Sequence, residues 1–160
     1  MSDLKPVAGA KFYIGDTAMA TQSTDFVAGD FSGVTWVEVD GWETAGNLGD
    51  AAAQIVTPLI NRKRDIKQKG TRDAGTMENQ FAHIHADAGQ AAMRAAEAGT
   101  LNWPFRIVFD DIPSGGSTGT TQYFVGLVST WRDTNGGANT TRMYQGTVDV
   151  NSNIVTQAAA

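Results

Sequence analysis

The residues best suited to chemistry are two histidines and a carboxylate in the segment HIHAD, namely His83, His85 and Asp87. On a β-strand the two imidazoles would point to the same face, and imidazole is a good ligand for zinc, copper or iron. Asp87, however, is expected to cap a helix that starts directly after it. The chain has no cysteine, so a metal site here would need further carboxylates. The segment therefore favours the polar end of a strand, with a small metal-dependent enzyme as the less favoured alternative.

Two other stretches could serve catalysis. The glycine-rich stretch PSGGSTGTT lacks the lysine of a phosphate-binding loop and precedes a predicted strand rather than a helix, so we expect a hairpin loop. Asp110 and Asp111 could act together as acid and base, but they lie where a strand is expected to turn, a place that favours Asp for backbone reasons. We expect no serine to act as a nucleophile. The sequence therefore predicts no enzyme activity, no bound metal and no cofactor.

The segment INRKRDIKQKGTRD, residues 60–73, is strongly basic in an acidic chain. It holds six of the twelve Lys and Arg residues: Arg62, Lys63, Arg64, Lys67, Lys69 and Arg72. With its two acids the segment carries a charge of +4. The rest of the chain, with six cations against fifteen acids, carries −9, which gives the total of −5.

Three interpretations of this segment compete: a nucleic-acid contact, a solvated loop, and a surface made for an acidic partner. Aromatic residues do not interleave with the cations and no recognition helix is apparent, which weakens the first interpretation. An acidic remainder of the chain would also repel nucleic acid. The charge distribution favours docking of the segment from one copy on the acidic surface of the next, because complementary charges steer association.

The elements that must position these residues are mostly strands. Hydrophobic patterning predicts strands over 10–16, 33–42, 54–60, 76–85, 102–109, 121–131 and 140–150. One helix is predicted over about 87–98, with Asp87 as N-cap, Gln90 completing a capping box, and Gly99 at the C′ position. Pro58 is expected at a sheet edge or at a bulge, followed by a long basic loop over 61–75.

This order of elements predicts an α+β, mainly antiparallel β fold, a β-sandwich-like or barrel-like domain with one flanking helix. The strand over 121–131 is apolar on both faces, so we expect a second sheet to cover its outer face. At 160 residues, with 41% hydrophobic and 18% charged residues, one domain over 1–160 is expected. A flexible N-terminal arm (1–9) and a C-terminal tail (151–160) would flank it.

Two targeting signals are missing from the sequence. The longest apolar runs fall short of the ~20 residues of a membrane span, and the N-terminus does not have the pattern of a signal peptide. We therefore expect synthesis in the cytoplasm and no membrane partner. Without cysteine, durability would come from packing or from self-association.

Several segments together resemble a known family. The succession of EAGTLNWPFRIVFDD, YFVGLVSTW and GTVDV resembles the C-terminal half of the tail tube protein (major tail protein) of long-tailed, non-contractile bacteriophages. AKFYIGD, GVTWVEVDGW and the polar stretch after QIVTPLI resemble the first half. The resemblance covers nearly the whole chain and lies in the pattern and order of strands.

The resemblance implies a structural virion protein. Six subunits would form a ring, and stacked rings would form the tail tube that conducts DNA into the host, without specific DNA binding. It implies synthesis in the host bacterial cytoplasm and a place in the virion tail, with tape measure, tail terminator and tip proteins as further partners. An acidic chain suits a DNA conduit, because acidic wall residues would not hold phosphates. The six cations of the basic segment would then contact a neighbouring subunit or ring.

Glu38, Glu78 and Asp149 lie in predicted strands and are candidates for lining the channel. Ordinary solvent-facing strand acids are an equally open interpretation of each. A nucleic-acid-binding accessory protein that uses the basic segment over 62–72 is the alternative function.

Overall fold

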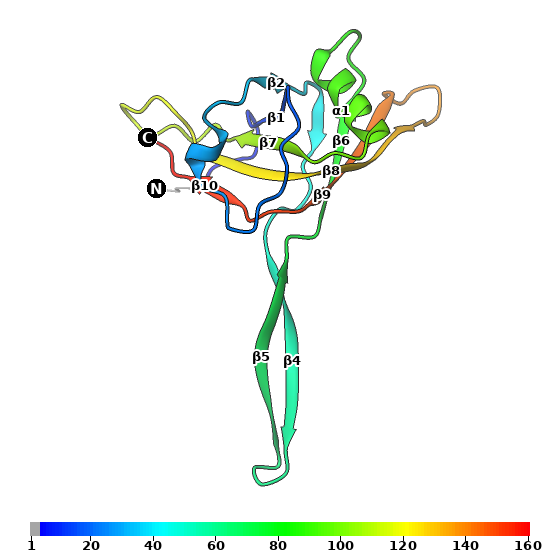
Figure 1. Cartoon of the computed structure of the whole chain (residues 1–160). Helices are drawn as coiled ribbons and strands as arrows, with labels where there is room; N and C mark the ends of the chain where they lie inside the picture. The colour runs from blue at the N-terminus through cyan, green and yellow to red at the C-terminus, as the bar shows by residue number, and fades with distance from the viewer. Residues whose placement is uncertain (1–3) are drawn as a thin grey trace.

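The computed structural model describes residues 4–160 and consists of a body of strands with one α-helix, from which a long β-hairpin projects (Figure 1). This architecture confirms the prediction of a mainly antiparallel, β-sandwich-like α+β fold. Within the described range, no helix has both the length and the hydropathy needed to cross a membrane.

The body is built on one eight-stranded sheet in the order β2-β1-β7-β8-β9-β6-β3, with β10 paired to β8 outside this path. Among the described residues, the strands of this sheet pair antiparallel. Its strands are β1 (Lys11–Gly15), β2 (Trp36–Glu38), β3 (Trp42–Thr44), β6 (Thr76–Ala82), β7 (Trp103–Val108), β8 (Thr121–Thr134), β9 (Met143–Val150) and β10 (Val155–Gln157). The strand predicted over 33–42 is therefore two short strands, β2 and the start of β3.

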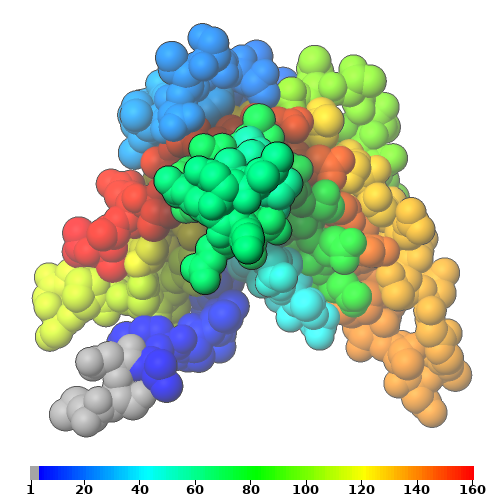
Figure 2. Space-filling view, turned by 90° about the horizontal axis from the view of Figure 1, so that it is seen from below, coloured from blue at the N-terminus to red at the C-terminus, as the bar shows by residue number. Residues whose placement is uncertain are grey.

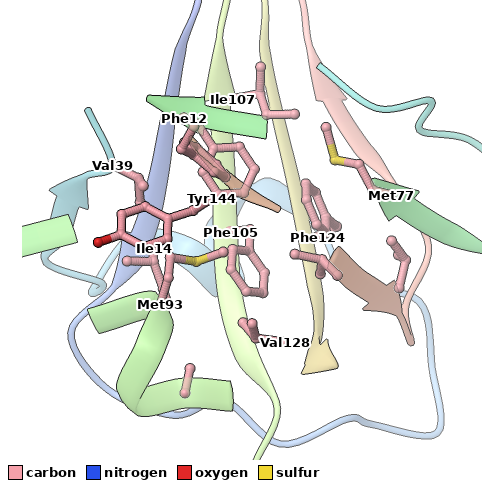
Figure 3. Packing of buried hydrophobic residues seen from close by; sticks show 14 residues of the cluster. Phe12, Ile14, Val39, Met77, Met93, Phe105, Ile107, Phe124, Val128 and Tyr144 are labelled. Carbon is pink, nitrogen blue, oxygen red and sulfur yellow. The ribbon is translucent and has the colours of Figure 1, made fainter. Parts of the chain in front are cut away.

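The sheet curls so that its two ends pack face to face around an aromatic core (Figure 3). Phe12 of β1 lies 5.4 Å from Trp42 of β3 and 5.7 Å from Phe81 of β6, measured between ring centroids. Phe105 and Phe124 stack beside them at 5.3 Å. Because these rings come from both ends of the sheet, their burial is the main force that holds the sandwich closed.

The outer face of β8 is covered by a connecting segment rather than by a second sheet, so that part of the prediction is wrong. Phe26 and Phe31, the latter in the 3₁₀ helix η1 (Ala28–Phe31), pack with Val125. Phe31 also stacks on Tyr123 at 5.0 Å. The segment is polar along most of its length, so the sequence pattern did not indicate that Phe26 and Phe31 cover the outer face of β8.

Helix α1 (Ala88–Ala98) begins at the predicted cap, because the Asp87 carboxylate accepts a hydrogen bond from the Gln90 amide at 2.9 Å. The Gln90 side chain does not complete a capping box. It donates instead to the carbonyl oxygens of Asp40 and Ala82 and accepts from the Ile84 amide. Gly99 is the C-cap residue with φ −94°, so the predicted left-handed C′ position is wrong.

A flexible N-terminal arm over 1–9 and a C-terminal tail over 151–160 are the expected ends of the chain. Residues 1–3 of the N-terminal arm lie outside the described residues, and 4–9 contain no strand. The tail over 151–160 contains β10, and the Ala160 carbonyl accepts hydrogen bonds from the amides of Ser117 and Thr118. The tail is therefore bonded to the body.

Candidate assembly surface

The basic segment is one strand of a hairpin, so the prediction of a long loop over 61–75 is wrong. Strand β4 (Ala51–Leu59) pairs antiparallel with β5 (Arg64–Asp73), and the two strands form a sheet of their own. Pro58 is accommodated because each strand of a two-stranded ribbon has a free edge where no amide donor is needed. Ten residues of β5 give the hairpin a length of about 30 Å.

The six cations lie along this hairpin in two groups. Arg62 and Lys63 form the turn, where Lys63 adopts a left-handed conformation with φ 51°. The other four, Arg64, Lys67, Lys69 and Arg72, lie in β5. The cations are thus spread from the tip of the hairpin to its base, where the Arg72 guanidinium lies 3.8 Å from the Asp50 carboxylate.

The register of the hairpin sorts its side chains onto two different faces, because directly opposed residues in an antiparallel pair share a face and neighbours along a strand alternate. The first face, here called the basic face, holds Lys67, Lys69 and Arg72, opposite Val56, Gln54 and Ala52. Apart from Val56, these residues also line a groove with Asp50. The second, here called the aliphatic face, holds Ile55, Thr57, Leu59 and Ile66, with Gln68 and Arg64.

The body does not cover either face of the hairpin. Every residue of β4 and β5 is exposed except Leu59, Ile66 and Gly70, which are half-buried. In the view along the hairpin, it stands in front of a body that widens to either side (Figure 2). An isolated two-stranded ribbon is marginal in water at best, so a ribbon of this length with aliphatic side chains on one face needs a partner.

The sequence expectation missed the aliphatic face. Its signal was present in the two-residue spacing of Ile55, Thr57 and Leu59, and in Ile66 as the one aliphatic residue inside the basic run. The spacing alone could not identify a face, because the face depends on which residues of β5 oppose those of β4.

Two of the three candidate channel acids lie together. In the pairing of β6 with β9, Glu78 opposes Thr147 and Asp149 opposes Thr76, so all four share the face opposite the core. Asp149 also accepts a hydrogen bond from the Thr76 hydroxyl at 2.8 Å. Gln80 and Gln145 continue this face, which makes it a polar surface of hydroxyl, amide and carboxylate groups.

The third acid, Glu38, lies at the other end of the sheet. It opposes Tyr13 in the pairing of β2 with β1, and its carboxylate is 4.0 Å from the Lys11 ammonium. Glu38 is therefore separated from the polar face that carries Glu78 and Asp149.

The segment HIHAD connects β6 to α1, and its side chains make structural contacts there. His83 Nδ1 lies 2.8 Å from the Tyr144 hydroxyl, and Asp87 is committed to the cap of α1. Residues 4–160 contain no group of three or more His, Cys, Asp or Glu side chains placed to hold a metal ion. The geometry thus favours the polar end of a strand.

The loop between β7 and β8 contains the remaining catalytic candidates. Residues 115–119, GGSTG, do match the G-x-S-x-G spacing of a nucleophile elbow around Ser117. That elbow requires a strand-to-helix turn, whereas this loop leads into β8, and Ser117 is exposed. The Asp111 carboxylate accepts hydrogen bonds from the hydroxyl and the amide of Thr120, which lower its pKa. Asp111 thus links the start of this loop to Thr120 at its end.

Comparisons with known proteins identify the fold. Neither a protein-family model nor a curated protein matches the sequence. A chain of the PVC sheath/tube terminator, from the cryo-EM structure of an extracellular contractile injection system in the extended state, matches with TM-score 0.68 at 10% identity. The match covers 98% of this chain and 99% of that chain.

Two further solved structures agree. A chain of the PVC sheath-tube complex matches with TM-score 0.68 at 9% identity, over 98% of this chain and 93% of that one. The SPP1 tail tube matches with TM-score 0.63 at 13% identity, over 96% of this chain and 80% of that one. The chain therefore shares a fold with chains from both contractile injection systems and a phage tail tube, and the fold does not distinguish between them.

Proposed function

We propose that this chain is a structural subunit that assembles with copies of itself into a tube. The observation that carries the proposal is the projecting hairpin over 51–73, which has an aliphatic and a basic face and is not covered by its own body. A partner is required, and the charge distribution favours a second copy, since a hairpin of +4 meets a body of −9. The shared fold with tube and terminator chains supports the same conclusion.

In this proposal each hairpin reaches a neighbouring subunit or ring, with Arg62, Lys63, Arg64, Lys67, Lys69 and Arg72 at the contact. A contact between two different surfaces of the same chain is heterologous, and such contacts generate rings where the rotation closes and filaments where it does not. Six subunits in each ring and stacking of rings into the virion tail tube of a non-contractile phage, with tape measure, terminator and tip proteins as partners, complete the proposal. Its role is structural rather than catalytic.

The same proposal assigns the polar face of β6 and β9 to the channel wall. Glu78 and Asp149 repel phosphate, while the half-buried Gln80 and Gln145 offer hydrogen bonds to water. DNA would move along such a wall during ejection without being held. Glu38 is left out of the wall because it lies at the opposite end of the sheet beside Lys11.

Negative-stain electron microscopy of the purified protein over a series of concentrations tests the proposal. Rings with a central hole, or tubes built from them, are the expected result. Compact monomers at every concentration, including in the presence of preformed tube fragments as seeds, would contradict it.

A further inference from the structure

We infer that the aliphatic face of the hairpin is the surface that seats on the neighbouring copy, and that the basic face steers the approach and lies at the rim of this contact. The inference rests on the proposed function and assigns separate tasks to the two faces. It starts from the register of β4 and β5, in which side chains alternate between the two faces except at the irregularity between the pairs Ala52–Arg72 and Gln54–Lys69.

Burial within the hairpin already separates the two faces. Of the hairpin strands, the residues that are half-buried are Leu59, Ile66 and Gly70. Leu59 and Ile66 belong to the aliphatic face, and a Cβ at Gly70 would lie 3.4 Å from Ile55 on that same face. The two large side chains of the hairpin strands that are half-buried thus both belong to the aliphatic face.

Chemistry separates the faces as well. Burial of Lys67, Lys69 and Arg72 in an interface would require a carboxylate for each cation, because an unpaired buried charge is strongly destabilising. Burial of Ile55, Leu59 and Ile66 removes exposed hydrocarbon from water and needs an apolar surface. Arg64, the one cation of this face, lies next to the turn, where it can stay at the rim of the contact. Interfaces follow this division, with charged residues depleted at their centres and present at their rims.

The partner is a second copy of this chain. The hairpin carries a net charge of +4 and the rest of the chain a net charge of −9. The electrostatic attraction of a hairpin is therefore strongest toward the body of another copy. Steering of this kind raises the rate of association, whereas the aliphatic contact sets how long the bound state lasts.

Ile55 and Val56 provide a matched pair for the test. They are adjacent in β4 and equally exposed, at 48% and 47%, but alternate between the aliphatic and the basic face. Threonine at either position keeps a β-branched side chain and its preference for strands. We would compare Ile55→Thr with Val56→Thr, and add Ile66→Thr to the first variant to enlarge its effect. Sedimentation measures the concentration at which half of the protein is assembled.

The double variant on the aliphatic face is expected to raise that concentration by roughly tenfold or more, and Val56→Thr to change it less than about twofold. Lys67→Gln combined with Lys69→Gln is expected to slow assembly and weaken its dependence on salt, with a smaller effect on the end point. Near-ultraviolet circular dichroism checks that the body of every variant is folded.

The outcomes separate the inference from the proposed function. If the wild type forms tubes and Ile55→Thr/Ile66→Thr assembles equally well, the assignment of the faces is overturned. The same holds if Val56→Thr impairs assembly as strongly as the double variant does. Either result leaves the tube proposal standing. Wild-type protein that does not assemble under any condition overturns the tube proposal and the inference together.

Discussion

The Asp50 carboxylate lies 3.8 Å from the Arg72 guanidinium, at the point where the hairpin leaves the body. The Arg72 side chain is 71% exposed, and exposed ion pairs contribute ~0–1 kcal/mol. The pair therefore orients the base of the hairpin without supporting the body. Arg72→Gln is expected to change the free energy of unfolding of the subunit by less than about 0.5 kcal/mol, as measured by urea denaturation. A larger loss would show that the hairpin base is part of the core.

Reversal of charge at the tip tests steering where it should be strongest. Replacing Arg62, Lys63 and Arg64 with Glu changes the hairpin charge from +4 to −2, since three reversals remove six units. A negative hairpin approaches an acidic body against repulsion, so tube formation is expected to be blocked. The body should remain folded, because the tip makes no contribution to its core. Electron microscopy measures tube yield and circular dichroism measures folding.

Unchanged tube yield in that variant would contradict a role of the tip in assembly. The salt dependence of the wild type is the control, because screening at high ionic strength should slow its assembly in the same direction.

Gly89 is required for the docking of α1 on the sheet. A Cβ at this position would collide with the carbonyl oxygen of Glu38 and the backbone of Val39. Because backbone atoms cannot move aside cheaply, Gly89→Ala is expected to lower the free energy of unfolding by ~1–3 kcal/mol. Gly33→Ala is the matched control, since a Cβ there meets nothing within 4 Å. Chemical denaturation of both variants measures the difference, and equal stabilities would contradict the packing described for α1.

Part of this architecture was predictable from the sequence. Alternation of apolar residues predicted β1, β7 and β9, and Asp87 predicted the start of α1, because these signals act over a few residues. The hairpin was not predictable as a pair of strands, since β5 has a basic and polar sequence and owes its structure to pairing with β4. The cover over β8 depends on Phe26 and Phe31, two side chains in an otherwise polar segment whose partner Val125 is distant in sequence. Of the candidate site, the positions of the cations were predictable, whereas the face to which each belongs depends on the register.

Asp111 makes the stability of the β7–β8 loop dependent on pH. Hydrogen bonds from the Thr120 hydroxyl, and then from its amide, lower the pKa of Asp111 below its usual 3.8. A group with a lower pKa in the folded state binds protons more weakly there, so its contribution to stability is present above pH 3.8 and is lost as the pH falls through the folded pKa. Asp111→Asn should therefore lower the stability near neutral pH and flatten the loss of stability at acidic pH.

Urea denaturation at a series of pH values, from neutral to strongly acidic, measures this effect. Asp110→Asn is the control, because within the described part of the chain the Asp110 carboxylate accepts no hydrogen bond from Thr120. If the free energy of unfolding falls identically at acidic pH in the wild type and in Asp111→Asn, the assigned role of Asp111 is contradicted.

The polar face of β6 and β9 is tested by giving it the opposite charge. Glu78 and Asp149 lie on the face opposite the core, so Glu78→Lys combined with Asp149→Lys leaves the packing of Met77 and Val148 unchanged. Wild-type tubes are expected to pass through a DNA column at low salt, whereas tubes of the double variant are retained and released by added salt, because each new cation can neutralise a phosphate. The same substitutions leave every side chain of the basic and aliphatic faces unchanged, so tubes are still expected to form. Retention of wild-type protein at low salt would favour the nucleic-acid-binding alternative, and flow-through of both proteins would show that this face is not reached by DNA.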